Sequence, residues 1–156
     1  MKLVLACVGE RMPAWVTEGF HEYAKRLPPS LSLTLLEVPL AARARRGDVA
    51  RWRREEGERL LQRLPKDCRL VALDVKGRSC STGDLALTLE NWMTEGRPVA
   101  LLVGGPDGLD EACLARAEWC WSLSPLTFPH PLVRVILAEQ IYRAVSILHH
   151  HPYHRA

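Results

Sequence analysis

Short, continuously apolar runs alternate with segments of helical periodicity along this chain. Residues 3–8 form the first run, and a strand that is apolar on both faces needs helices on both sides of its sheet. Trp15, Val16, Phe20 and Tyr23 then recur at helical spacing. Because the same alternation continues to the end of the sequence, it predicts an α/β fold with a single, mainly parallel, five-stranded sheet.

The predicted elements fit one domain. A chain of 156 residues with 47% hydrophobic and 25% charged residues is expected to form one globular domain over residues 1–156. The pattern does not predict the order of the strands in the sheet. Strands are expected at residues 3–8, 31–38, 68–75, 98–103 and 119–123, and helices at residues 13–27, 49–64, 82–95, 110–118 and 132–148.

Composition predicts a cytoplasmic protein with reduced thiols. The longest apolar stretches are about seven or eight residues, whereas a membrane span needs roughly twenty, and no secretory signal is recognised at the start. The five cysteines are odd in number and form no CxxC pair, which is typical of buried thiols in a reducing compartment. We therefore expect no membrane association and no metal site.

Positive charge is concentrated in one segment. Residues 43–54 contain six arginines and one acidic residue, Asp48. Such a cluster suits a polyanionic partner. An equally plausible alternative is a solvated helix start, because Glu55, Glu56 and Glu58 follow at spacings that allow ion pairs.

Three segments that directly follow predicted strands are candidates for a ligand site. In open parallel sheets, ligands bind beyond the carboxyl ends of the strands. The segments are residues 73–81, 104–108 and 123–128. The second, Gly-Gly-Pro-Asp-Gly, allows close backbone approach, but it matches neither a P-loop nor GxGxxG, and the alternative is a turn that merely needs glycine.

The third segment belongs to a proline-rich string, and the chain ends in a histidine-rich tail. Leu-Ser-Pro-Leu-Thr-Phe-Pro-His-Pro, residues 123–131, has the stiffness and scattered polar groups of a pocket wall. The tail, residues 149–155, holds four histidines without a carboxylate or thiol beside them, so contact with a nucleobase and phosphate is favoured over a metal. No Ser-His-Asp or Cys-His arrangement can be assembled, which predicts chemistry that depends on positioning.

Three strings in order carry a resemblance to a known family. They are LVGGPDGL at residues 102–109, WSLSPLTFPHPLVRVILAEQIYRA at residues 121–144, and HPYHR at residues 151–155. Together they resemble the RlmH family of ribosomal large-subunit methyltransferases, in the SPOUT class. The similarity extends to residues 2–26, so that it covers nearly the whole chain.

The resemblance implies a trefoil knot in the carboxyl-terminal part, a homodimer, and a pocket for S-adenosylmethionine. It also implies methylation of N3 of a pseudouridine in a stem-loop of 23S rRNA, on the assembled ribosome. A bulky substitution at Gly104 is expected to block the cofactor and leave the fold intact. The cofactor residues carried over by position are Leu73, Gly104, Leu123, Ser124, Pro125, Leu126, Thr127 and Phe128.

Candidate catalytic residues lie near the end of the chain. Arg143 and Arg155 are cations that would favour a deprotonated N3, and neutral His154 is a candidate proton acceptor. Tyr153 suits stacking on a base, and the tail is expected to extend away from the knot toward an incoming stem-loop. Two other interpretations stay open: a non-catalytic RNA-binding protein, and a flavodoxin-like nucleotide-binding module.

Overall fold

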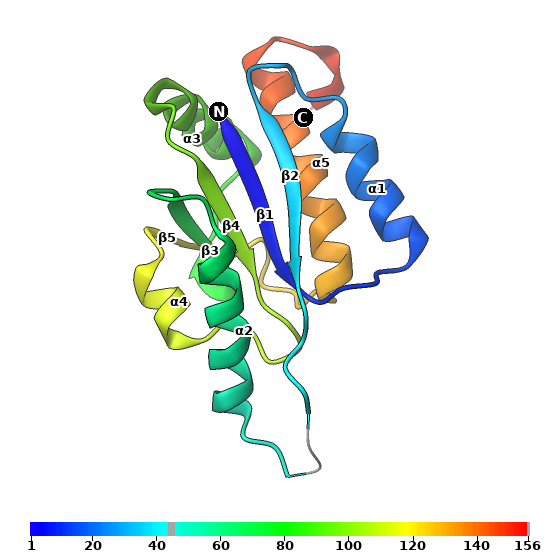
Figure 1. The fold of residues 1–156 in the computed structure, drawn as a ribbon. Coiled ribbons are helices and arrows are strands. Elements are labelled where there is room, and N and C mark those ends of the chain that lie inside the picture. The colour runs from blue at the N-terminus through cyan, green and yellow to red at the C-terminus, as the bar shows by residue number, and fades with distance from the viewer. Residues whose placement is uncertain (44–45, 156) are drawn as a thin grey trace.

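The computed structural model describes residues 1–43 and 46–155 and has an α/β architecture (Figure 1). The sheet is all-parallel in the order β2-β1-β4-β3-β5, which confirms the predicted class. The strands are β1 (Lys2–Val8), β2 (Ser32–Val38), β3 (Arg69–Arg78), β4 (Val99–Val103) and β5 (Trp119–Trp121); the helices are α1 (Ala14–Ala24), α2 (Val49–Arg63), α3 (Thr82–Glu95), α4 (Glu111–Arg116) and α5 (His130–Leu148), followed by a short 3-10 turn, η1 (Pro152–His154).

Helices cover both faces of the sheet, as the apolar strands require. On one face, Leu3 and Leu5 of β1 pack with α1, α3 and α5. On the other, Val4 and Ala6 pack with α2 and α4. Successive side chains of a strand point to opposite faces, so β1 contributes to both cores. α5 lies between α1 and α3 and contacts both.

A buried arginine holds the start of α5 against the sheet. Arg134 is 1% exposed. Its Nη1 donates to Glu37 Oε2 at 2.5 Å and its Nη2 donates to the Gly9 carbonyl at 2.8 Å. Glu37 belongs to β2 and Gly9 follows β1. This one guanidinium therefore ties α5 to the carboxyl ends of two neighbouring strands.

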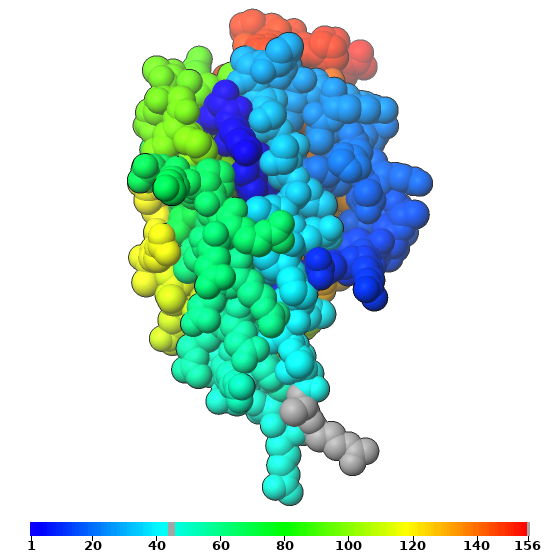
Figure 2. Space-filling model, in the orientation of Figure 1, coloured from blue at the N-terminus to red at the C-terminus, as the bar shows by residue number. Residues whose placement is uncertain are grey.

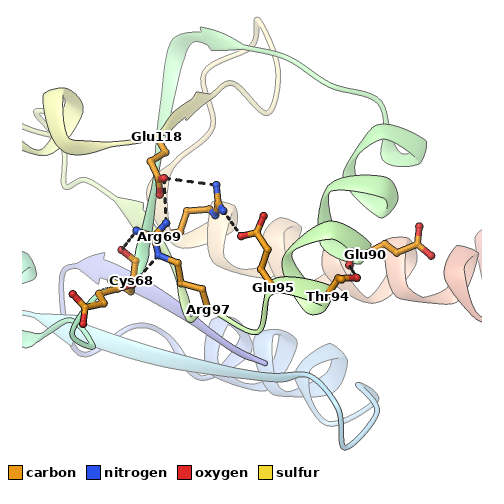
Figure 3. A network of polar contacts seen from close by, with 8 residues as sticks. Cys68, Arg69, Glu90, Thr94, Glu95, Arg97 and Glu118 are labelled. Carbon is orange, nitrogen blue, oxygen red and sulfur yellow. Dashed lines mark hydrogen bonds and ion pairs between the residues drawn. The ribbon is translucent and has the colours of Figure 1, made fainter.

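Ion pairs fasten the other end of the sheet, where β3, β4 and β5 begin (Figure 3). Arg69 pairs with Glu95 at 2.5 Å and lies 3.7 Å from Glu118. Arg97 pairs with Glu118 at 3.2 Å and donates to the Asp67 carbonyl at 2.8 Å. The network joins the end of α3 to the starts of β3 and β5.

Each edge of the sheet has a feature that limits pairing with a further strand. β5 has only three residues. Along the β2 side, Arg63 of α2 donates to the Glu37 carbonyl at 2.6 Å, and Arg59 donates to the Pro39 carbonyl at 2.9 Å. Side chains of α2 thus occupy main-chain acceptors at the end of β2 and just beyond it.

The cysteines are all free, but fewer are fully buried than expected. Cys7 and Cys113 are buried, and burial raises the pKa of each thiol to about 12. Cys68, Cys80 and Cys120 are only partly buried. No helix in the described part of the chain is long and apolar enough to span a membrane.

Two helical glycines differ in the space around them, and this yields a stability prediction. A Cβ on Gly57 of α2 would lie 2.4 Å from Asp110 Oδ1 and 3.1 Å from Cys113 Sγ, where α2 meets the start of α4. Asp110 caps α4, since its Oδ1 accepts from the Cys113 amide at 3.1 Å. Gly57→Ala should lower the free energy of unfolding by about 1–3 kcal/mol, because it overpacks this contact.

Gly83→Ala is the matched control, because its Cβ would meet only Ser81 Oγ at 3.7 Å. This change should be neutral or should stabilise the protein by up to about 1 kcal/mol. Urea denaturation of both variants measures the difference. Equal effects at the two positions would contradict the close packing of α2 on α4.

Candidate functional site

Three segments at one edge of the sheet line one cavity of about 630 Å³. Two of them follow β4 and β5, and the third, residues 73–76, lies within β3 beyond its last pairing with β4 at Ala72. These strands are neighbours in the sheet, so the three segments meet at the same edge. The cavity therefore lies where the sequence predicted a ligand site. Seven of the eight predicted cofactor residues line the cavity: Leu73, Gly104, Leu123, Ser124, Leu126, Thr127 and Phe128. Pro125 lies in the same loop but is not on the cavity wall.

An irregularity in β3 forms one wall. The register with β5 shifts between Leu73 and Arg78, both of which pair with Trp121. Residues 74–76 line the cavity. The segment expected as a loop from Lys76 to Ser81 is therefore strand as far as Arg78, because Arg78 pairs with Trp121 and its carbonyl accepts from the Ser122 amide at 3.1 Å.

The glycine-rich segment after β4 closes on itself as a turn. The Gly108 amide donates to the Gly105 carbonyl at 3.0 Å, and Gly108 has a φ of 82°, which favours glycine. Asp107 projects toward Arg43, whose Nη2 lies 2.8 Å from Asp107 Oδ2. The turn is thus both a cavity wall and a contact for the segment before α2.

The expectation that a bulky residue at Gly104 would leave the fold intact is wrong. A Cβ there would lie 2.5 Å from the Gly108 carbonyl carbon and 2.7 Å from the Leu109 amide nitrogen. Main chain cannot yield as an exposed side chain can, so Gly104→Val would distort the turn itself. The segment is not a loose loop that tolerates bulk.

The loop after β5 is held by short-range hydrogen bonds. Ser124 Oγ accepts from the Leu126 amide at 3.0 Å, and Ser122 Oγ donates to the Ser124 carbonyl at 3.1 Å. This turn leaves Leu126 69% exposed at the cavity. An apolar side chain held in water beside a cavity is typical of a surface that a ligand covers.

The cavity also contains residues that the sequence analysis did not name individually as site residues, although Asp74, Lys76 and His130 lie within the segments that it selected. Arg53, Asp74, Lys76 and His130 lie on its wall. Burial and the nearby Arg134 guanidinium lower the pKa of His130, so its imidazole is neutral at neutral pH. His130 stood in the proline-rich string, and only its place at the start of α5 brings it to the cavity.

The tail folds back on α5 instead of extending from it. Tyr153 Oη donates to Glu139 Oε1 at 3.0 Å, and the rings of Tyr142 and Tyr153 are 4.6 Å apart. Arg143 pairs with Glu139 at 2.6 Å and lies 4.9 Å from the Tyr153 ring. Its Nη1 also donates to the His154 carbonyl at 3.4 Å. The expectation of a freely projecting tail is therefore wrong.

The structure brings Arg143, Tyr153 and His154 together, with Arg155 next in the chain, but it separates them from the cavity. The tail lies at the far end of α5, beside the amino ends of the strands, whereas the cavity lies beside their carboxyl ends (Figure 1). Along α5, Arg143 lies ten residues beyond Val133 of the cavity wall, which corresponds to about 15 Å. Within one chain, Arg143, Tyr153, His154 and Arg155 do not line the cavity.

Comparison with known proteins identifies the class. Residues 1–154 match a family model described as "Predicted SPOUT methyltransferase". The chain therefore belongs to the SPOUT methyltransferase family, and the enzyme class expected from the sequence is confirmed. The match extends over the cavity and over most of the tail.

Individual relatives carry a more specific name, "Ribosomal RNA large subunit methyltransferase H". The chain is 61% identical over 155 residues to the protein of that name from Thioalkalivibrio sulfidiphilus, with 99% of both chains covered. It is 55% identical to the namesakes from Methylococcus capsulatus and Azotobacter vinelandii, with 99% of this chain and 100% of each relative covered. The resemblance to the RlmH family is thereby confirmed.

The docked tail gives a titration prediction. Burial and the hydrogen bond to Glu139 raise the pKa of Tyr153 to about 12. A free tail titrates near pH 10, so docking is fully favourable below that pH and weakens as the pH rises from 10 to about 12. The phenolate absorbance that Tyr153→Phe removes should therefore appear near pH 12. If the absorbance that is lost in Tyr153→Phe titrates near pH 10 instead, the tail is undocked.

Proposed function

We propose that this chain transfers a methyl group from S-adenosylmethionine to N3 of a pseudouridine in a stem-loop of 23S rRNA. It acts on the assembled ribosome, as a homodimer, in the cytoplasm. The observation that carries the proposal is the cavity formed by residues 73–76 of β3 and the segments after β4 and β5, in a chain that aligns over almost its full length with named rRNA methyltransferases.

The cavity suits the chemistry of this cofactor. Its volume lies in the range of small-molecule sites, about 300–1,000 Å³. Leu73, Leu123 and Phe128 supply apolar wall for the adenine ring, and Asp74 and Glu111 supply carboxylates for the positively charged part of the molecule. The predicted residues therefore fit the group, and Ser124 and Thr127 add hydroxyls for its polar atoms.

Catalysis then depends mainly on positioning. S-adenosylmethionine, when bound, supplies a methyl group on a sulfonium leaving group. The turn at Gly104 to Gly108 and the loop at Leu123 to Phe128 align the cofactor, and alignment of two reactants can lower a barrier by roughly 7–11 kcal/mol. The N3 proton must also leave. We propose His154 as its acceptor, with Arg143 and Arg155 stabilising the anion and Tyr153 stacking on the base.

These tail residues need a second subunit. Because Arg143, Tyr153, His154 and Arg155 do not line the cavity of their own chain, we propose that the tail of one subunit meets the cavity of the other in a two-fold dimer. α5 supports this assembly: Val135, Tyr142 and Ile147 remain partly exposed on a helix that is apolar nearly all round. A dimer would bury that surface.

A substitution at Leu126 tests the cofactor site. Leu126→Ala should weaken S-adenosylmethionine binding by roughly tenfold, because it removes apolar surface that the bound cofactor would cover. The side chain is exposed, so the fold should be unchanged. Leu87→Ala is the control, because Leu87 is 59% exposed on α3 and does not line the cavity. Calorimetry that finds equal affinities in the two variants would exclude Leu126 from the site.

Deletion of residues 153–156 tests the role of the tail. Methyl transfer to ribosomes should fall by several orders of magnitude, since contacts of about 1–3 kcal/mol each are lost at three residues. Cofactor affinity should change less than about tenfold. Sedimentation should show that the shortened protein is still a dimer. Transfer at nearly the full-length rate would mean that the tail does not act on the substrate.

A further inference from the structure

Residues 40–43 and 46–54, here called the arginine arm, form a positively charged surface, of which only Arg53 lines the cavity. The described part of the arm includes Arg46, Arg51 and Arg54, all exposed, with Asp48 as its only acidic residue. Arg45 lies outside the described residues. In the space-filling view, the cyan and teal segment around the start of α2 reaches past the body of the molecule (Figure 2).

The guanidinium of Arg43 holds the beginning of the arm in place. Arg43 Nη1 lies 2.6 Å from Glu56 Oε2 and 2.8 Å from the Ala41 carbonyl, and its Nη2 lies 2.8 Å from Asp107. Glu56 is 1% exposed and also accepts from the Ala41 amide at 3.0 Å. Arg43 therefore has a structural role, and its positive charge is already paired with the carboxylates of Glu56 and Asp107.

The exposed arginines that follow Arg43 in the arm are available to a partner. Arg46 and Arg54 form no ion pair with any described residue, and Arg51 has only an exposed pair with Glu55 one helical turn away. Exposed pairs of this kind contribute little stability, so a phosphate could replace the glutamate at small cost. The alternative of a charge-balanced helix start applies to Arg43 and Arg51, but not to Arg46 and Arg54.

The arm and the cavity share one side of the molecule. Arg43 reaches the turn after β4, which is a cavity wall, and Arg53 of the arm itself lines the cavity. A macromolecule with one nucleotide inserted at the cavity would therefore bring its neighbouring phosphates near the arm. Arginine suits that contact, because its planar fork binds phosphate oxygens in pairs.

A membrane surface fits the arm less well than RNA does. Membrane-binding helices carry a continuous apolar face beside the basic one. The first two turns of α2 expose Arg51 and Arg54, and among the described residues nearby the large apolar side chains that are exposed are only Leu40 and Val49.

We propose that the arginine arm binds the phosphate backbone of the RNA substrate through Arg46, Arg51 and Arg54, beside the site of methyl transfer. The proposal rests on the proposed function and names the surface that holds its substrate. Arg43 keeps the arm in place against the cavity wall. The arm supplies affinity without reading sequence, because phosphate contacts carry no base information.

Three Arg→Gln substitutions at positions 46, 51 and 54, combined in one protein, test this proposal. The probes are large ribosomal subunits and whole ribosomes that lack the modification. The dissociation constant and the KM should rise roughly tenfold or more, while the rate at saturating substrate stays the same. The dependence of log K on log salt should become shallower by roughly 2, since each lost phosphate contact contributes about 0.7–0.9. Cofactor affinity should be unchanged.

The matched control removes three exposed cations from the opposite end of the sheet, with Lys2→Gln, Lys66→Gln and Arg116→Gln combined. It loses the same net charge and should keep the wild-type salt dependence. An unchanged salt dependence in the arm variant, or an equal loss in the control, would overturn the proposal. Loss of binding to anionic vesicles with normal ribosome binding would assign the arm to a membrane instead. Absence of methyl transfer by the wild-type protein, with arm-dependent ribosome binding, would contradict the proposed function alone.

Discussion

The position of α5 depends on one buried charge. Arg134 is almost fully enclosed, and an enclosed guanidinium is costly unless it is paired and hydrogen-bonded. Its Nη1 and Nη2 contacts with Glu37 and the Gly9 carbonyl satisfy two of the three guanidinium nitrogens and fix the helix at the carboxyl ends of β1 and β2, whereas Nε is buried without a partner. Removing one partner of such a pair typically costs about 3–5 kcal/mol. The rest of α5 is placed as a consequence, with His130 at the cavity and Glu139 under the tail.

The cavity, in turn, depends on strand order. β3 lies between β4 and β5, so residues 73–76 of β3 meet the segments that follow β4 and β5, although the three are far apart in the sequence. The register shift after Leu73 moves residues 74–76 out of regular pairing and onto the cavity wall. Each wall is rigid for a local reason: a glycine turn after β4, a bulge in β3, and serine hydrogen bonds after β5.

Local patterns predicted the helices and strands well, but they did not predict the contacts between residues that are far apart in the sequence. Continuous apolar runs located strands such as β1 and β4, because burial on both faces leaves no polar position to confuse the pattern, whereas β2 was located by its alternating pattern. The same runs could not show that β3 continues to Arg78, since Lys76 and Gly77 look like a turn and the pairing with Trp121 is non-local. Gly77 is required there because a Cβ would meet the Cys120 carbonyl at 2.5 Å.

The residues of the candidate site also fall into two groups, those that a local pattern predicts and those that it does not. Leu123, which follows the end of β5, could be placed at the cavity from its position, whereas the places of His130 and Arg53 depend on the packing of whole helices. The tail was identified as a unit, but its docking on Glu139 was not, because a hydrogen bond from Tyr153 to a helix 14 residues earlier leaves no periodic signal. The knot implied by the family resemblance stays a prediction.

The two edges of the sheet also bear on how copies of this chain can associate. An open edge strand offers unpaired amides and carbonyls to any passing chain, and is a common starting point for aggregation. Here one edge is only three residues long, and arginines of α2 occupy carbonyls at the end of the other. Continuous sheet formation between molecules is therefore disfavoured. The dimer that we propose instead uses a helix surface, that of α5, and a two-fold contact of this kind closes on itself rather than growing into a fibril.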